Sequence, residues 1–185
     1  MKIGILGGSF NPAHDGHIKI SLQAIDLLNL DKVYWLITKQ NPLKSSKEYL
    51  SLDLRIEKAK NIIDKRNIEI INIEEETKSN YIIDNLRHIK LNDNTNQFIF
   101  LMGADSFLSL DKWKNYENIF EEFPIAIFNR NGLEKQVING FIGKKYEKFR
   151  LNYNSRELLY EKNPSWVFIK NFDENISSTE IRLEK

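Results

Sequence analysis

KIGILGGSFNPAHDGH, residues 2–17, runs from an apolar segment into a glycine-rich turn, and apolar residues recur at helical spacing after it, from Ile18 to Leu28. The first part predicts a buried strand over Ile3–Leu6, and the periodic part predicts a helix. A strand that enters a helix through a glycine-rich turn presents backbone N–H groups to phosphate oxygens. The stretch therefore predicts a phosphate-binding turn at the start of an α/β unit.

Short apolar strands continue to alternate with helical patterns along the chain. Residues 97–102 (QFIFLM) form the most apolar run, which predicts a central strand buried on both faces. A polar segment, 131–164, shows some helical character, and the charge runs Glu74–Glu76 and Lys144–Lys145 are expected on the surface. The alternation predicts a parallel sheet with right-handed crossovers and helices on both faces. Further strands are expected at 32–38, 68–73, 125–128 and 166–169, and further helices at 52–63 and 81–91.

Polar and glycine residues follow several of these predicted strands. Ligands of a parallel sheet bind beyond the carboxyl ends of the strands, at the point where the strand order reverses. We therefore expect four segments to converge on one sheet edge: the glycine turn after Leu6, the loop around Lys44, Gly103–Asp105 and Arg130. The glycines alone match neither the dinucleotide fingerprint nor the phosphate loop of nucleoside triphosphatases, so a plain strand-to-helix connection remains an alternative.

The composition bounds the kind of protein. With 185 residues, 41% of them hydrophobic, we expect one domain over residues 1–185. Lysine and arginine (27) nearly balance aspartate and glutamate (26), and the net charge of +1 favours neither a nucleic-acid nor a membrane partner. The sequence has no cysteine, which excludes disulfides and fits a reducing compartment. The short apolar start breaks at Gly7, so no secretory or membrane-spanning segment is predicted and we expect a cytoplasmic protein.

Two histidines at the first predicted helix change the interpretation of the glycine turn. His14 and His17 are three residues apart, which places both imidazoles on one helix face, and Gly16 leaves room for a ligand. A metal site would need further ligands, and the one other histidine, His88, lies in another predicted helix. Capping of the helix is a second alternative. The favoured hypothesis is that both rings donate hydrogen bonds to phosphate oxygens beside the helix N-terminus.

A second anion-binding motif lies near the other end of the chain. Residues 176–182 (ISSTEIR) combine three hydroxyl side chains with Arg182 one turn later. An ordinary helix N-cap would explain the serines and the following glutamate. The hydroxyls, the helix N–H groups and the guanidinium would also bind a polyphosphate strongly. The motif becomes informative in combination with the histidine pair.

Together the two motifs resemble the nucleotidylyltransferase superfamily, whose signatures are (H/T)xGH near the N-terminus and SSTxIR near the C-terminus. The longer string GGSFNPAHDGH is similar to the bacterial nicotinate-mononucleotide adenylyltransferases. Comparable elements cover most of the chain, namely NPLK at 41–44, GADS at 103–106 with Trp113 after it, and Arg130 with Gly132. The resemblance implies a Rossmann-like α/β fold, a doubly wound parallel sheet in a single domain, in agreement with the pattern of strands and helices.

The resemblance also implies a reaction, in which ATP and nicotinate mononucleotide give nicotinate adenine dinucleotide and pyrophosphate. The attacking group would be a phosphate monoester, whose second pKa of about 6 leaves it largely ionised at neutral pH, so no general base is needed. Catalysis would rest on aligning two anions and neutralising charge on the α-phosphate and the leaving pyrophosphate. Mg²⁺ bound mainly through the ATP phosphates is implied. The sequence predicts no oligomeric state.

Roles for individual residues follow from the same resemblance. The implied catalytic residues are His14, His17, Lys44 and Arg182, with His17 stabilising the transition state. Tyr81 and Trp113 are implied to bind nicotinate mononucleotide, Trp113 by stacking on the pyridine ring, and no protein ligand to a metal is implied. For Trp113, helix packing remains an alternative, as does an exposed loop cation for Lys44. The residues implied to contact ATP are Gly8, Ser9, Phe10, Gly16, Gly103, Asp105, Arg130, Ser177, Ser178 and Thr179.

The sequence departs from the family pattern at three places. The family's Ser-Tyr-Thr before an acidic residue, which helps to recognise the pyridine carboxylate, is replaced here by residues 80–84 (NYIID). The residue after Trp113 is Lys114, where the family often has an aromatic residue. The chain ends at Lys185, where relatives are expected to continue through another helical segment.

Three rival functions share part of this pattern. Phosphopantetheine adenylyltransferase and the cytidylyltransferases use the same two motifs, but the GGSFNP opening and Trp113 disfavour them. A non-catalytic nucleotide-binding module is disfavoured by the intact His17 and Arg182. A fragment of a class I aminoacyl-tRNA synthetase is disfavoured because 185 residues of balanced charge leave no room for a tRNA-binding body.

Overall fold

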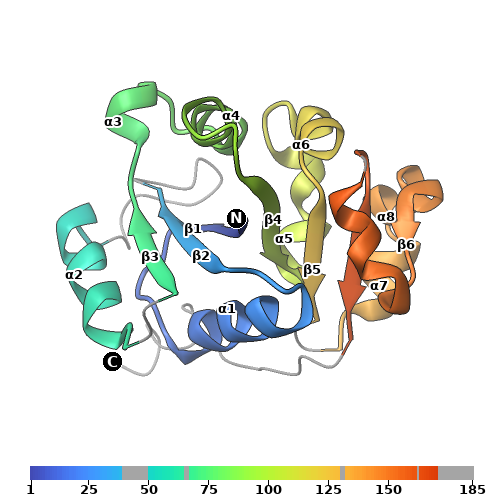
Figure 1. Cartoon of the computed structure of the whole chain (residues 1–185), viewed down its shortest axis with the longest axis horizontal. Helices are drawn as coiled ribbons and strands as arrows, with labels where there is room; N and C mark the ends of the chain where they lie inside the picture. Colours follow the sequence, from blue (N-terminus) through green and yellow to red (C-terminus); the bar gives the residue numbers. More distant parts are fainter. Residues whose placement is uncertain (39–49, 65–66, 130–131, 162, 171–185) are drawn as a thin grey trace.

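A seven-stranded sheet in the order β3-β2-β1-β4-β5-β7-β6 forms the centre of the structure, and every neighbouring pair is parallel (Figure 1). The computed structural model describes residues 1–38, 50–64, 67–129, 132–161 and 163–170. The strands are β1 (Lys2–Gly8), β2 (Lys32–Ile37), β3 (Ile68–Ile71), β4 (Gln97–Gly103), β5 (Ile125–Phe128), β6 (Arg150–Leu151) and β7 (Trp166–Ile169).

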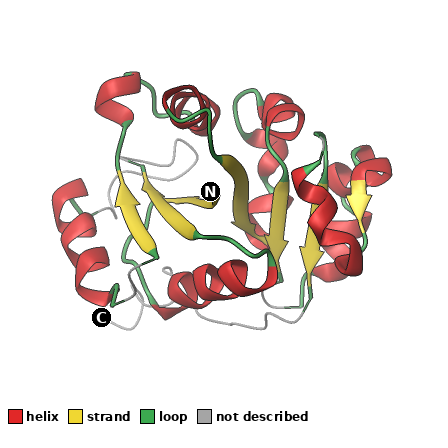
Figure 2. Ribbon diagram, in the orientation of Figure 1, coloured by secondary structure: helices red, strands yellow, loops and turns green. Residues whose placement is uncertain are grey.

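Helices cover both faces of the sheet (Figure 2). The faces can be told apart along β4, where Phe98, Phe100 and Met102 join one hydrophobic cluster while Ile99 and Leu101 join the other. This alternation follows the pleat of the strand, and it confirms that residues 97–102 form a central strand buried on both faces. The sheet is therefore doubly wound, as the sequence pattern predicts.

Each hydrophobic cluster is completed by its own set of helices. The first receives buried side chains from α4 (Ile82–Asn92), α5 (Ala104–Leu108), α6 (Tyr116–Glu122), α7 (Glu134–Asn139) and α8 (Phe141–Lys145). The second receives them from α1 (Asp15–Leu27), α2 (Leu52–Ile62) and η4 (Tyr153–Tyr160). The remaining elements are α3 (Glu74–Thr77), η2 (Leu110–Lys112) and η3 (Glu147–Phe149). Within the described ranges, none of these helices combines the length and the apolar character that a membrane crossing requires.

The strand order reverses between β1 and β4. The chain builds β1, β2 and β3 outward in one direction, and β4 then pairs with the other side of β1. Such a reversal opens a crevice beyond the carboxyl ends of the two strands. β1 runs to Gly8 rather than to Leu6, so Gly7 and Gly8 end the strand, and the turn that follows them lies at this edge together with Gly103 at the end of β4.

Several details of the sequence prediction are wrong. Glu74 is not on the surface but only 4% exposed, because the short helix α3 packs against α4 and turns its first residue inward. β3 ends at Ile71 rather than residue 73, since Ile73 is already the N-cap of α3. The apolar residues that recur from Ile18 to Leu28 are not all buried, since Leu22 of α1 is exposed while Ile20 and Ala24 lie in the core. Strand β6, with two residues, and helix α3, with four, are too short for a hydrophobic periodicity to predict them from the sequence.

Candidate active site

Helix α1 begins with a reciprocal pair of hydrogen bonds made by two histidines. His14 is the N-cap, and its Nδ1 accepts the backbone N–H of Gly16 at 3.1 Å. The backbone N–H of His14 donates to Nδ1 of His17 at 3.2 Å. This is the geometry of a capping box, with imidazole nitrogens in place of the usual hydroxyl and carboxylate. The capping interpretation of the two histidines is therefore correct.

The capping contacts also fix the tautomer of both rings. Because each Nδ1 accepts a hydrogen bond, the proton of the neutral imidazole must sit on Nε2, which makes Nε2 an N–H donor. The two ring centroids are 4.0 Å apart, and His14 is 8% exposed. Two Nε2–H donors thus lie together at the N-terminus of a 13-residue helix. Such a group of donors suits negative charge on phosphate oxygens.

An aromatic cluster supports the His17 ring from behind. The ring of Phe10, only 1% exposed, lies 4.6 Å from His17 and 4.9 Å from Trp35, centroid to centroid. Trp35 Nε1 donates to Ser21 Oγ at 2.8 Å, and Ser21 Oγ donates to the His17 carbonyl, also at 2.8 Å. Ser21 and Trp35 were not among the predicted site residues. Spacing in the sequence places each in its own element but cannot show that β2 and α1 bring them together.

Close packing explains why position 7, near the end of β1, is a glycine. A Cβ built on Gly7 would lie 3.0 Å from Ile82 Cδ1 and 3.2 Å from the Phe100 ring, so a larger residue would require these two side chains to move. Phe10 adopts the left-handed backbone conformation, with φ of 46°, which a buried aromatic residue rarely does. Such conformations persist where the surrounding structure holds them, and they occur most often at ligand sites.

The end of β4 faces the glycine turn across the switch point. Leu6 and Leu101 are the last residues that pair between β1 and β4, and Gly8 and Gly103 end these two strands at the same edge of the sheet. Gly103 is buried and is the N-cap of α5, and Asp105 in the first turn of that helix is exposed. The structure therefore brings together Gly8, Ser9, Phe10, Gly16, Gly103 and Asp105 with the histidine pair at one sheet edge, as predicted.

Tyr81 and Trp113 come from two neighbouring segments. Tyr81 is the N-cap of α4, and Trp113 follows η2. The Lys114 ammonium lies 4.1 Å from the centre of the Tyr81 ring, which joins the two segments. Trp113 is partly buried against the hydrophobic cluster of the sheet, so it packs as the alternative interpretation expected while keeping an exposed part.

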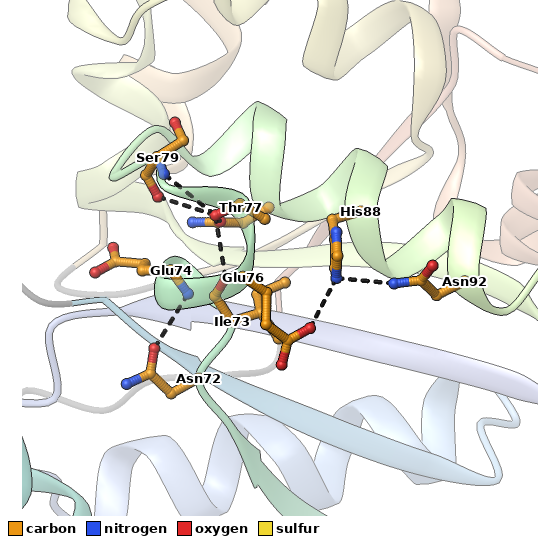
Figure 3. A network of polar contacts seen from close by, with 9 residues as sticks. Asn72, Ile73, Glu74, Glu76, Thr77, Ser79, His88 and Asn92 are labelled. Atoms are coloured by element: carbon orange, nitrogen blue, oxygen red, sulfur yellow. Dashed lines mark hydrogen bonds and ion pairs between the residues drawn. The ribbon is translucent and has the colours of Figure 1, made fainter.

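Hydrogen bonds fix the connection between α3 and α4, and Figure 3 shows those that join Thr77 to Ile73 and to Ser79. Ser79 Oγ accepts the Tyr81 N–H at 3.2 Å and donates to Asp84 Oδ2 at 2.6 Å. The Thr77 hydroxyl donates to Asn85 Oδ1 at 2.7 Å and accepts the Ser79 N–H at 3.3 Å. The segment that replaces the family's Ser-Tyr-Thr is thus fixed by its own side chains.

His88 does not take part in the site. Its Nε2 lies 3.0 Å from Glu76 Oε2 and 2.8 Å from Asn92 Nδ2, so the ring extends from α4 toward α3 (Figure 3). The part of the chain that the structure describes contains no group of three or more histidine, aspartate or glutamate side chains that could hold a metal ion.

Part of the predicted site lies outside the described residues. These positions are Lys44, Arg130, Ser177, Ser178, Thr179 and Arg182. Their implied roles stay predictions. One further side chain at this edge escaped the sequence analysis, namely Arg55 of α2, whose helical position gave no sign that it faces the glycine turn.

Two known proteins of similar sequence carry the same name, nicotinate-nucleotide adenylyltransferase. A family model described as cytidylyltransferase-like matches residues 5–184. A probable nicotinate-nucleotide adenylyltransferase of Agrobacterium fabrum is 33% identical over 183 residues, covering 98% of both chains. The corresponding protein of Ruegeria sp. is 34% identical over 98% of this chain and 96% of its own. Since these relatives are covered almost completely, the expectation that relatives continue well past Lys185 is wrong for them.

Solved structures agree on the fold. A Plasmodium falciparum nicotinic acid mononucleotide adenylyltransferase complexed with NaAD superposes with a TM-score of 0.69 at 19% identity, covering 97% of this chain and 81% of its own. A putative nicotinate-nucleotide adenylyltransferase of Vibrio parahaemolyticus superposes with a TM-score of 0.58 at 21% identity, covering 74% of this chain and 79% of its own. With 32–34% identity to curated relatives over nearly its whole length, the chain belongs to the nicotinate-nucleotide adenylyltransferase family of cytidylyltransferase-like proteins.

Proposed function

We propose that this protein transfers the adenylyl group of ATP to nicotinate mononucleotide, forming nicotinate adenine dinucleotide and pyrophosphate for NAD biosynthesis. The observation that carries the proposal is the histidine pair at the start of α1, whose capping contacts make both Nε2 atoms donors. Full-length relatives named for this reaction support it, and so does a fold neighbour that was solved with NaAD.

The chemistry needs alignment and charge neutralisation more than proton transfer. The phosphate of nicotinate mononucleotide attacks the α-phosphorus of ATP, the bond to the β-phosphate oxygen breaks, and pyrophosphate leaves. The attacking phosphate is already largely ionised at neutral pH, so no general base is assigned. His14 and His17 donate from Nε2 to ATP phosphates, and His17 has the larger part in stabilising the transition state.

The remaining ATP contacts are proposed from the family pattern. Lys44 and Arg182 neutralise the triphosphate as the other two catalytic residues, together with the hydroxyls of residues 177–179. Gly8, Ser9, Phe10 and Gly16 surround the phosphates. Gly103, Asp105 and Arg130 flank the adenylate. The position of Gly8 and Gly103 on either side of the switch point supports this division.

The binding site for the acceptor, nicotinate mononucleotide, is assigned to the region between η2 and α4. Tyr81 and Trp113 bind the nicotinate mononucleotide, with Trp113 stacking on the pyridine ring. The partial exposure of Trp113 and the Lys114–Tyr81 contact support a site between η2 and α4. The ammonium of Lys114 adds a positive charge close to this proposed site.

A divalent cation accompanies ATP in nucleotidyl transfer, and we assign Mg²⁺. It would be bound mainly through the phosphate oxygens, as Mg²⁺ usually is in nucleotide sites, and would supply positive charge to the phosphates. No side chain of this protein is assigned to hold it. We further propose that residues 1–185 form one nucleotidyltransferase domain in the cytoplasm, supported by the family match over 5–184 and the cysteine-free sequence.

The proposal is tested by measuring pyrophosphate release from ATP and Mg²⁺ with one acceptor at a time. The acceptors are nicotinate mononucleotide, nicotinamide mononucleotide, phosphopantetheine and glycerol 3-phosphate. Turnover is expected to be fastest with nicotinate mononucleotide. Fastest turnover with phosphopantetheine would identify a sister enzyme instead, and ATP binding without turnover of any acceptor would identify a non-catalytic module.

A further inference from the structure

Arg55 of α2 is a charged side chain with only 1% of its surface exposed. Its guanidinium donates to three backbone carbonyls from different parts of the chain. Nε reaches the Leu50 carbonyl at 3.1 Å, and Nη1 reaches the Thr38 carbonyl at 2.7 Å and also the Ser9 carbonyl. A buried guanidinium is costly to desolvate, and these three hydrogen bonds compensate for the water contacts that it loses.

Two of the three carbonyls, those of Ser9 and Thr38, directly follow the last paired residues of β1 and β2. The Thr38 N–H still donates to the Gly8 carbonyl at 3.1 Å, which is one step beyond the last paired residues, Gly8 and Ile37. The guanidinium supplies the donor for the next carbonyl on each strand, that of Ser9 after β1 and that of Thr38 after β2. Arg55 therefore fixes the direction in which the chain leaves β1 and enters the glycine turn.

A second contact closes a ring of hydrogen bonds around the turn. The Leu50 N–H donates to Asn11 Oδ1 at 3.1 Å, while the Leu50 carbonyl accepts from Arg55. Asn11 is 1% exposed. The turn is thus held at Ser9 and at Asn11, on both sides of Phe10. Phe10 in turn packs 4.6 Å from the His17 ring.

We propose that Arg55 is a positioning residue for adenylyl transfer, which holds the Ser9–Asn11 turn and through Phe10 the His17 ring in the reactive arrangement. This inference rests on the proposed function of the site. Arg55 is assigned no contact with a substrate. Its effect comes from geometry, since small misplacements of reacting groups reduce rates strongly.

The test compares Arg55→Lys with a matched control, Arg156→Lys. Lysine keeps the positive charge but loses the planar fork that reaches several carbonyls at once. Arg156 likewise donates to two backbone carbonyls, of Leu27 at 2.6 Å and Tyr153 at 3.1 Å, but it does so at the opposite end of α1 from His14. For each variant, kcat, KM for both substrates and the melting temperature are measured.

Arg55→Lys is expected to lower kcat at saturating substrates by about 10- to 100-fold, whereas Arg156→Lys leaves kcat unchanged even where it lowers the melting temperature. A kcat of Arg55→Lys equal to that of Arg156→Lys would reduce Arg55 to a merely structural residue. Rates are taken relative to the unsubstituted protein with the acceptor that it turns over fastest. A different preferred acceptor therefore overturns the proposed substrate but leaves the comparison of the two arginines intact.

Chemical rescue provides a second readout if Arg55→Lys is poorly folded. Arg55→Ala removes the side chain and leaves space for free guanidinium ion. Added guanidinium at low millimolar concentration is expected to raise kcat of Arg55→Ala several-fold over sodium chloride of equal ionic strength, and to leave Arg156→Ala unchanged. Equal responses of the two alanine variants would contradict the proposal.

Discussion

The imidazole rings of His14 and His17 lie 4.0 Å apart, and the Nδ1 of each accepts a backbone N–H group at the start of α1. Capping a helix and binding phosphate are thus not alternatives for these histidines. The capping contacts use Nδ1, and in doing so they fix Nε2 as a hydrogen-bond donor. The same two hydrogen bonds stabilise the helix and prepare the rings for an anionic ligand.

Replacement of His17 tests which ring nitrogen matters. The amide nitrogen of glutamine reaches about as far as Nε2, whereas that of asparagine lies near the position of Nδ1. We expect His17→Asn to lower kcat by about 100-fold or more, as for loss of one preorganised donor, and His17→Gln to retain clearly more activity. Steady-state kinetics with calorimetric ATP binding checks this, because ATP affinity should change far less than kcat. Equal kcat for both variants would argue against Nε2.

Replacement of His14 separates the cap from the chemistry. Asparagine is among the best N-cap residues, so His14→Asn should keep the helix start, while His14→Ala should lower the free energy of unfolding by about 1 kcal/mol. Both variants lack Nε2, and both should lose activity alike. Urea unfolding and kcat measured on the same samples decide the matter. If His14→Asn regained activity together with stability, the role of His14 would be capping alone.

The connection before α4 allows a test of the acceptor site. Ser79→Ala removes the acceptor for the Tyr81 N–H and the donor to Asp84. We expect KM for nicotinate mononucleotide to rise while KM for ATP stays constant. Thr95→Ala is the matched control, since Thr95 Oγ1 donates to Asp93 Oδ1 at 3.1 Å in an exposed turn after α4. A parallel rise of both KM values would remove Tyr81 from the acceptor site.

The ion pair between α4 and α6 predicts a pH dependence of stability. Hydrogen bonds from Arg87 lower the pKa of the Glu122 carboxyl below its ordinary value of 4.5. A lowered folded-state pKa stabilises the protein above the pKa of the unfolded chain, and this stabilisation is lost as the pH falls through the folded-state pKa. Arg87→Met should therefore lower the free energy of unfolding by up to about 1 kcal/mol at pH 7. This difference between the variant and the unsubstituted protein should become smaller below pH 4.5. Urea unfolding at several pH values would contradict this if the difference were constant.

The sequence predicts the fold better than it predicts the support of the site. Residues 97–102 show a buried central strand, and the motif from Gly7 to His17 indicates the ligand edge, because both depend on local pattern. The burial of Glu74 and the contact of the Phe10 ring with His17 could not be predicted, since both depend on which elements pack together. Arg55 was missed for the same reason: a charged residue near a helix start is normally solvated.

A competition assay is the most direct test of the proposed adenylyl transfer to nicotinate mononucleotide. Nicotinate mononucleotide, nicotinamide mononucleotide and phosphopantetheine are supplied together at equal concentration with ATP and Mg²⁺, and the adenylylated products are identified by mass. Product ratios in such a mixture report the ratios of kcat/KM. Nicotinate adenine dinucleotide is expected as the main product, with one pyrophosphate released for each dinucleotide. A main product from either other acceptor, or pyrophosphate without a dinucleotide, would contradict it.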